Sequence, residues 1–135
     1  MNFRTFKQNK LVRDKIVSLM ESQGSKLYSF QLNDHDFNKQ LKIKLQEEAA
    51  EVLQAQTPQE LIEELSDVLE IVHALANLHN ISSKDLSKAQ EKKRIQKGGF
   101  EGRTFVTFAE HPKDSPQERY CLADCEKYPE VKSQQ

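Results

Sequence analysis

Two long segments with the apolar spacing of helices dominate the middle of the chain and constrain what it can fold into. Apolar residues recur every three or four positions through 37–53 and again through 61–76. Between them, residues 57–60 (TPQE) form a strong helix start, with threonine as N-cap, proline at the first helical position and glutamate completing a capping box. Asn33 or Asp34 can cap the earlier segment. The sequence therefore predicts two long helices joined by a short turn.

Shorter elements are predicted on both sides of this pair. Residues 11–23 have helical spacing, and 82–96 begin with a capping serine and stop at a Gly-Gly pair. The alternating segment 26–32 and the β-branched and aromatic segment 103–108 predict short strands, which we expect to pair because a lone strand is unstable. The expected fold is all-α, a bundle of about four helices with a small two-stranded β addition.

The domain organisation follows from length and from a change in composition near residue 110. A chain of 135 residues suits one domain. The last part is polar and contains three prolines, which favours an extended or partly disordered segment. We therefore expect a helical domain over 1–109 and a polar C-terminal appendage over 110–135.

Composition excludes several classes of protein. The formal net charge of −1 gives no global positive field, so no nucleic-acid partner is expected. There is no apolar run of about 18 residues and no signal-like apolar start, so we expect no membrane partner and a cytoplasmic location. A hydrophobic content of 36% is lean for a lone monomer, and some apolar surface is expected to be buried between subunits.

Two cysteines and the histidines are interpreted as structural or surface residues. Cys121 and Cys125 imply no disulfide framework, and without a second pair they do not make a zinc site. His73 and His79 lie on the second long segment and are expected to be packing or surface residues.

Each long helix carries an unusual group of carboxylates. Residues 47–51 read EEAAE and residues 63–67 read EELSD, so Glu48/Glu51 and Glu64/Asp67 each lie three positions apart on one helical face. Like charges so placed repel, and a hard divalent cation with oxygen ligands would relieve this. The alternative is that they are solvated surface charges. The pattern alone leaves both open.

Four sequence blocks together resemble a known family. KLQEEAAEV (44–52) and EELSDVLE (63–70) resemble the E-x-x-E, spacer, E-x-x-D signature of the MazG-like and phosphoribosyl-ATP pyrophosphohydrolase superfamily. NKLVRDKI (9–16) and EKKRIQKGGFE (91–101) are similar to one branch of it. The resemblance spans about residues 9–108 and implies an all-α nucleoside triphosphate pyrophosphatase that commonly assembles as a homodimer or tetramer.

The resemblance also implies a site. Glu48, Glu51, Glu64 and Asp67 would hold Mg²⁺, with Mn²⁺ as a substitute, and Glu47 together with Glu48 and Glu51 would act in catalysis. Glu47 would hold the attacking water or a second metal. Water would attack the α-phosphorus of a nucleotide, which releases pyrophosphate and a monophosphate.

A polyphosphate substrate also needs cations. Clustered lysines and arginines before the Gly-Gly pair can simply complement a helix dipole, and the neighbours Arg13 and Asp14 can form a surface ion pair. The resemblance favours phosphate contacts for Arg94 and Lys97 and leaves both interpretations of the Arg13–Asp14 pair open. The candidates are Lys10, Arg13, Lys15, Lys44, Arg94 and Lys97.

Three functions remain open at this stage. The leading hypothesis is a nucleoside triphosphate pyrophosphohydrolase that acts on a small-molecule nucleotide. The second is phosphoribosyl-ATP pyrophosphohydrolase of histidine biosynthesis, which the motifs do not separate from the first. The third is a non-catalytic helical module that binds metal or nucleotide.

Overall fold

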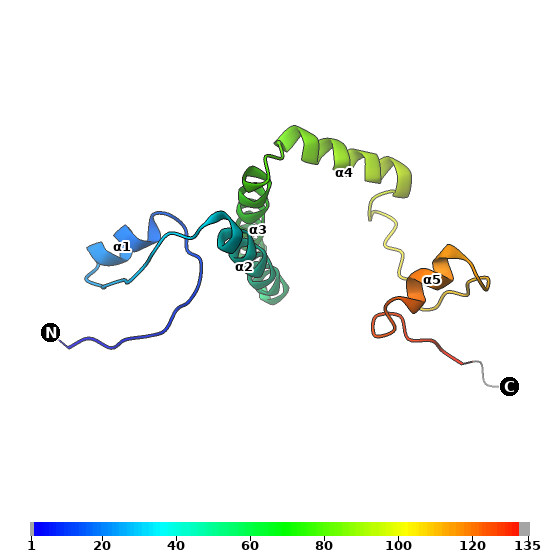
Figure 1. Ribbon diagram of the computed structural model, residues 1–135, viewed down its shortest axis with the longest axis horizontal. Coiled ribbons are helices and arrows are strands. Elements are labelled where there is room, and N and C mark those ends of the chain that lie inside the picture. The colour runs from blue at the N-terminus through cyan, green and yellow to red at the C-terminus, as the bar shows by residue number, and fades with distance from the viewer. Residues whose placement is uncertain (1, 133–135) are drawn as a thin grey trace. The chain divides into compact units, whose positions relative to one another are not determined.

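The computed structural model describes residues 2–132 and contains helices but, in that part of the chain, no strand. The predicted all-helical class is therefore confirmed. Residues up to Gln96 and residues from Lys97 onward form two compact units, while the predicted domain boundary after residue 109 stays a prediction. The helices are α1 (Ile16–Ser22), α2 (Asp34–Gln54), α3 (Pro58–Leu78), α4 (Ser83–Lys97) and α5 (Pro116–Leu122) (Figure 1).

The helices α2 and α3 begin at the predicted caps. The Asn33 side chain accepts a hydrogen bond from the backbone N–H of Asp36 at 2.8 Å. Thr57 accepts from the N–H of Glu60 at 3.1 Å, and the Glu60 carboxylate accepts from the N–H of Gln56 at 2.9 Å. These local bonds satisfy N–H groups that the first turn of a helix leaves unpaired. They also fix the residue at which each helix starts, and therefore which faces of α2 and α3 pack together.

The α2–α3 pair is the packed centre of the first unit (Figure 1). Its most buried apolar side chains are Leu41 on α2 and Ile71 and Ala76 on α3. A side-chain hydrogen bond of 2.7 Å between Asn38 and His79 ties the start of α2 to the end of α3, as an antiparallel pair requires. Other large apolar side chains of α3 stay exposed, so the core is thin.

The first helix is shorter than predicted. It begins at Ile16 rather than near residue 11, and no side chain caps its first turn. It ends as expected: Gly24 has a φ of 98°, and its N–H and that of the next residue bond back to the last turn at 3.0 Å. Glycine tolerates this left-handed conformation without the steric penalty of a Cβ atom.

The predicted two-stranded β addition is wrong. Residues 26–32 and 103–108 form no strands, and they belong to different compact units. Their aromatic side chains are largely exposed, and Arg103 has a φ of 53°, which is incompatible with an extended strand start. Alternation makes a segment suitable for a sheet, but a strand is stable only when another strand pairs with it.

The C-terminal part contains a helix that the sequence interpretation missed. α5 starts at a capping box in which Ser115 accepts a hydrogen bond from the N–H of Glu118 at 3.1 Å. The local sequence SPQE at 115–118 repeats the pattern TPQE that opens α3, so the signal was present. The expectation of an extended or partly disordered tail is corrected to that extent.

The long helix before this unit, α4, follows the prediction closely. Ser82 caps its first turn by accepting from the N–H of Asp85 at 3.1 Å, and Gly98 follows its end with a φ of 85°. None of the helices in residues 2–132 combines the length and apolar character needed to cross a membrane.

Candidate active site

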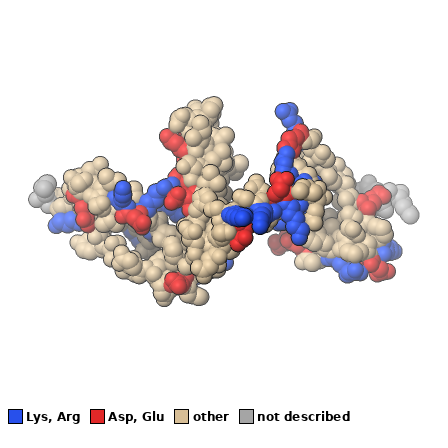
Figure 2. All heavy atoms as spheres, turned by 90° about the horizontal axis from the view of Figure 1, so that it is seen from above, with Lys and Arg blue, Asp and Glu red and all other residues tan. Residues whose placement is uncertain are grey.

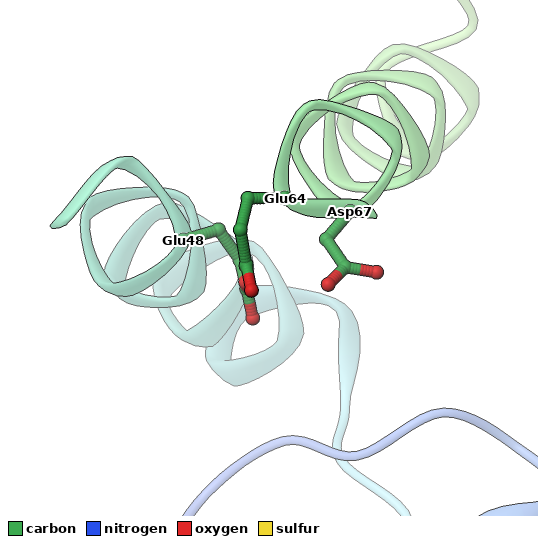
Figure 3. A group of neighbouring side chains, drawn as sticks. All are labelled: Glu48, Glu64 and Asp67. Atoms are coloured by element: carbon green, nitrogen blue, oxygen red, sulfur yellow. The ribbon is translucent and has the colours of Figure 1, made fainter. Parts of the chain in front are cut away.

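Three carboxylates from α2 and α3 converge on one side of the helix pair. Glu48 lies on α2, and Glu64 and Asp67 lie three residues apart on α3. Each offers an oxygen, and these oxygens lie within 4.8 Å of one another. Figure 3 shows the three side chains pointing to the same side of the pair. The packing of the two helices thus brings together three of the four carboxylates that the sequence singled out.

The repulsion among these carboxylates affects the pKa of Glu64. Partial burial, followed by the negative charges of Glu51, Asp67 and Glu48, raises the pKa of Glu64 above its usual value. Each of these neighbours disfavours the charged form because like charges repel across a short distance. A cation at this point would reverse the effect.

The fourth predicted metal ligand, Glu51, lies beside the cluster rather than in it. It is one helical turn beyond Glu48 and is close enough to Glu64 to raise its pKa. With Glu64 and Glu60 it lines a pocket of about 190 Å³, completed by Gln54 and Ala55. Glu60 was assigned only a capping role from the sequence, so its position at the pocket is a new observation.

Lys44 is the cation built into α2 next to the cluster. Its ammonium nitrogen lies 3.6 Å from a carboxylate oxygen of Glu47 and 3.6 Å from one of Glu48. The Lys44 and Glu48 side chains are only 20% and 13% exposed, so solvent screens this contact less than a surface pair. The structure therefore brings Glu47 into the neighbourhood of the cluster through a shared cation.

Arg13 reaches the cluster from outside the helix pair. Its Nη2 atom lies 2.6 Å from Oδ1 of Asp67. The sequence interpretation considered Asp14 as its partner, and nothing local could have indicated a residue 54 positions away. The N-terminal segment, blue in Figure 3, runs on the side toward which the carboxylates point.

The remaining predicted cations lie before α1 or on α4. Within residues 2–132, Lys10 and Lys15 make no ion pair with the three carboxylates. Arg94 lies on α4 in the first unit, and Lys97 ends α4 as the first residue of the second unit. Figure 2 shows both basic and acidic side chains on the visible face.

These observations define a class: an all-helical protein with converging carboxylates suited to a hard cation, flanked by an arginine and a lysine. The phosphoribosyl-ATP pyrophosphohydrolase family matches the chain over residues 11–94. The chain belongs to this family, which is part of the MazG-like all-α nucleoside triphosphate pyrophosphatase superfamily. It is thus an enzyme that hydrolyses phosphoric anhydrides, from a family that is generally metal-dependent. No curated protein and no solved structure matches the chain.

Proposed function

We propose that this enzyme is a magnesium-dependent nucleoside triphosphate pyrophosphohydrolase that cleaves between the α and β phosphates. The products are a nucleoside monophosphate and pyrophosphate. The observation that carries the proposal is the convergence of Glu48, Glu64 and Asp67 beside two cations, Arg13 and Lys44. Negative groups for a metal and positive groups for phosphate thus lie next to each other, as a metal–polyphosphate complex requires.

The donor set fits a hard divalent cation. All three converging groups are carboxylates, whose oxygens suit Mg²⁺ and also Mn²⁺ as a substitute. We assign Glu51 as the fourth ligand because it lies within electrostatic reach of Glu64. A bound divalent ion neutralises phosphate charge and lowers the pKa of a coordinated water.

The remaining catalytic and binding roles are assigned to residues of the chain itself. Glu47 is the proposed base that accepts the proton of the attacking water, and Glu48 and Glu51 act beside it. Lys44 bridges Glu47 and Glu48, and so holds the two carboxylates in a fixed relation. Lys10, Arg13, Lys15, Lys44, Arg94 and Lys97 are the proposed phosphate contacts.

The proposal includes two candidate substrates. The family fits phosphoribosyl-ATP equally well, and this is the second candidate substrate. The cluster and its cations act on the polyphosphate, which both candidates share, rather than on the base. A non-catalytic module is disfavoured because the chain belongs to a family of enzymes.

We also propose that the enzyme assembles as a homodimer or tetramer in the cytoplasm. Leu61, Leu65 and Leu69 follow one another at four-residue steps on α3 and are exposed in the single chain. Such a stripe is typical of a face that packs against another helix. A second copy would convert a thin two-helix core into a bundle.

The function is tested by pyrophosphate release from a panel of nucleoside triphosphates and phosphoribosyl-ATP in the presence of Mg²⁺. We expect at least one nucleotide to be cleaved, and Glu51→Gln to lose about 100-fold in rate, on the order of losing one transition-state contact. Glu70→Gln, an exposed carboxylate on the same helix as Glu64, serves as the matched control and should retain activity. Release of inorganic phosphate without pyrophosphate would contradict the proposed bond cleavage.

A further inference from the structure

The contact between Arg13 and Asp67 differs from the other ion pairs around the cluster. It joins residues 54 positions apart, whereas Lys44 pairs with residues three and four positions away on its own helix. The Arg13 and Asp67 side chains are 56% and 39% exposed. An ion pair this open to solvent contributes little to stability and is easily exchanged.

The carboxylate that Arg13 contacts also belongs to the metal cluster. Asp67 is one of the three residues whose oxygens converge, and the guanidinium bonds its Oδ1. An arginine and a divalent cation would therefore compete for the same negative charge. In the absence of metal, Arg13 is the cation that offsets the crowding at Asp67.

The guanidinium has further donors to offer. Its contact to Asp67 uses one nitrogen, Nη2, while an arginine carries five N–H groups in a fork that matches phosphate oxygens. The backbone of Arg13 is tied to the start of α1, where its carbonyl accepts from the N–H of Ile16 at 3.1 Å. The side chain can thus swing while its base stays in place.

We propose that Arg13 is an exchangeable counter-ion, which neutralises Asp67 in the metal-free enzyme and transfers to a phosphate of the substrate when the metal–nucleotide complex binds. Lys44, by contrast, is the fixed cation, because it is largely buried between two carboxylates of its own helix. This proposal rests on the proposed metal site. It adds a role in which one residue opposes metal binding and favours nucleotide binding.

The two roles have opposite signs, and this makes them measurable. Removing the guanidinium frees Asp67 for metal, so metal affinity in the absence of nucleotide should rise. The same change removes a phosphate contact, so nucleotide affinity should fall. A residue that only supported the fold would weaken both.

The experiment compares Arg13→Ala and Arg13→Lys with Lys7→Ala in the full chain. Lys7 lies in the same N-terminal segment, and Lys7→Ala removes the same charge without touching the cluster. Calorimetric titration with Mn²⁺ alone gives the metal Kd, and steady-state kinetics with Mg²⁺ and the best nucleotide give KM and kcat.

For Arg13→Ala we expect metal binding to tighten by about two- to fivefold, the range of an exposed ion pair. The KM should rise by about tenfold, as for a lost charge-assisted hydrogen bond, with a smaller change in kcat. Arg13→Lys should lie between wild type and alanine, and Lys7→Ala should match wild type in both measurements.

Several outcomes would overturn the proposal. Weaker metal binding by Arg13→Ala would show that Arg13 supports the site, and equal shifts in Lys7→Ala would show a general effect of charge. If the wild-type enzyme binds metal and releases pyrophosphate, but the Arg13 variants have the same metal Kd and KM as wild type, the counter-ion role of Arg13 is wrong. The proposed function would then still stand. Failure of the wild-type enzyme to bind metal or release pyrophosphate would overturn both.

Discussion

Glu64 is the single residue at which the requirements of folding and of function conflict most directly. It lies among Glu48, Glu51 and Asp67, and its pKa is raised by partial burial and by their charges. A chain selected only for stability would place an uncharged residue here. The conflict is resolved if a divalent cation sits among these carboxylates, since the repulsion then becomes attraction.

The first prediction concerns the metal-free stability of Glu64→Gln. A carboxyl whose pKa is raised in the folded state destabilises the fold when it is ionised, and this penalty fades as the pH falls through the folded pKa. In EDTA, Glu64→Gln should therefore unfold at higher urea than wild type at pH 7. The difference in stability between Glu64→Gln and wild type should become smaller as the pH is lowered toward the ordinary pKa of glutamate.

The sign should reverse when metal is present. With saturating Mg²⁺ the wild type gains binding energy that the glutamine variant lacks, so wild type should become the more stable protein. Glu70→Gln is the control and should show neither effect. A glutamine variant that is less stable than wild type at pH 7 in EDTA would contradict the assignment of unfavourable charge crowding to Glu64.

The second prediction concerns Lys44. Replacing it by methionine keeps the aliphatic stem but leaves Glu47 and Glu48 without their shared cation. Lys44 is also a proposed phosphate contact, and we expect kcat/KM to fall by about tenfold, since a hydrogen bond to a charged group is worth roughly 1.5–3 kcal/mol. Lys42→Met, an exposed lysine on the same helix, should leave kcat/KM unchanged. Equal losses in both variants would point to a general charge effect.

At the scale of the elements, the start of α3 connects a local motif to the geometry of the site. The bonds at Thr57 and Glu60 fix the first turn of α3. Glu64 and Asp67 follow one and two turns later, so their position relative to Glu48 depends on that start. Glu60 also lines the same pocket as Glu51 and Glu64, so one residue of the cap borders the site.

The third prediction is that Thr57→Ala destabilises the protein by about 1 kcal/mol, the usual cost of losing an N-cap side chain. Urea unfolding followed by circular dichroism measures this difference. The same variant should bind Mn²⁺ more weakly, because fraying of the first turn loosens Glu64. Thr5→Ala, an exposed threonine outside the helices, is the control. Unchanged metal affinity despite lower stability would show that the site does not depend on the cap.

At the scale of the whole molecule, the thin core of the first unit is the dominant fact. Leu41, Ile71 and Ala76 are the buried apolar residues among those described, while Leu65 and Leu69 face solvent on α3. Exposed leucines at helical spacing are costly in water and indicate a covered face. The proposed assembly of identical chains would cover it.

The fourth prediction follows from that face. Light scattering after size-exclusion chromatography should give the mass of a dimer or tetramer. Leu65→Asp/Leu69→Asp should shift the protein toward monomer, because burying two carboxylates in an apolar contact is unfavourable. Leu122→Asp changes a leucine that is also exposed but lies on α5, and it should leave the mass unchanged. A wild-type monomer at high concentration would contradict the assembly.

The sequence by itself determined what depends on neighbours along the chain. The caps at Asn33, Thr57 and Ser82 were predicted because each side chain bonds a backbone group three residues away. The acidic pairs were predicted for the same reason, since residues three apart share a helical face. The cap at Ser115 was equally local, and it was missed because prolines in the tail were interpreted as disorder.

Only the tertiary structure decided which distant groups meet. It joined Glu48 to Glu64 and Asp67 across two helices, and it gave Asp67 a partner at Arg13. It left residues 26–32 and 103–108 unpaired, although both have the composition of strands. The physical reason is common to all three: local bonds follow from adjacent residues, whereas long-range contacts depend on how whole faces pack, and no short pattern encodes that.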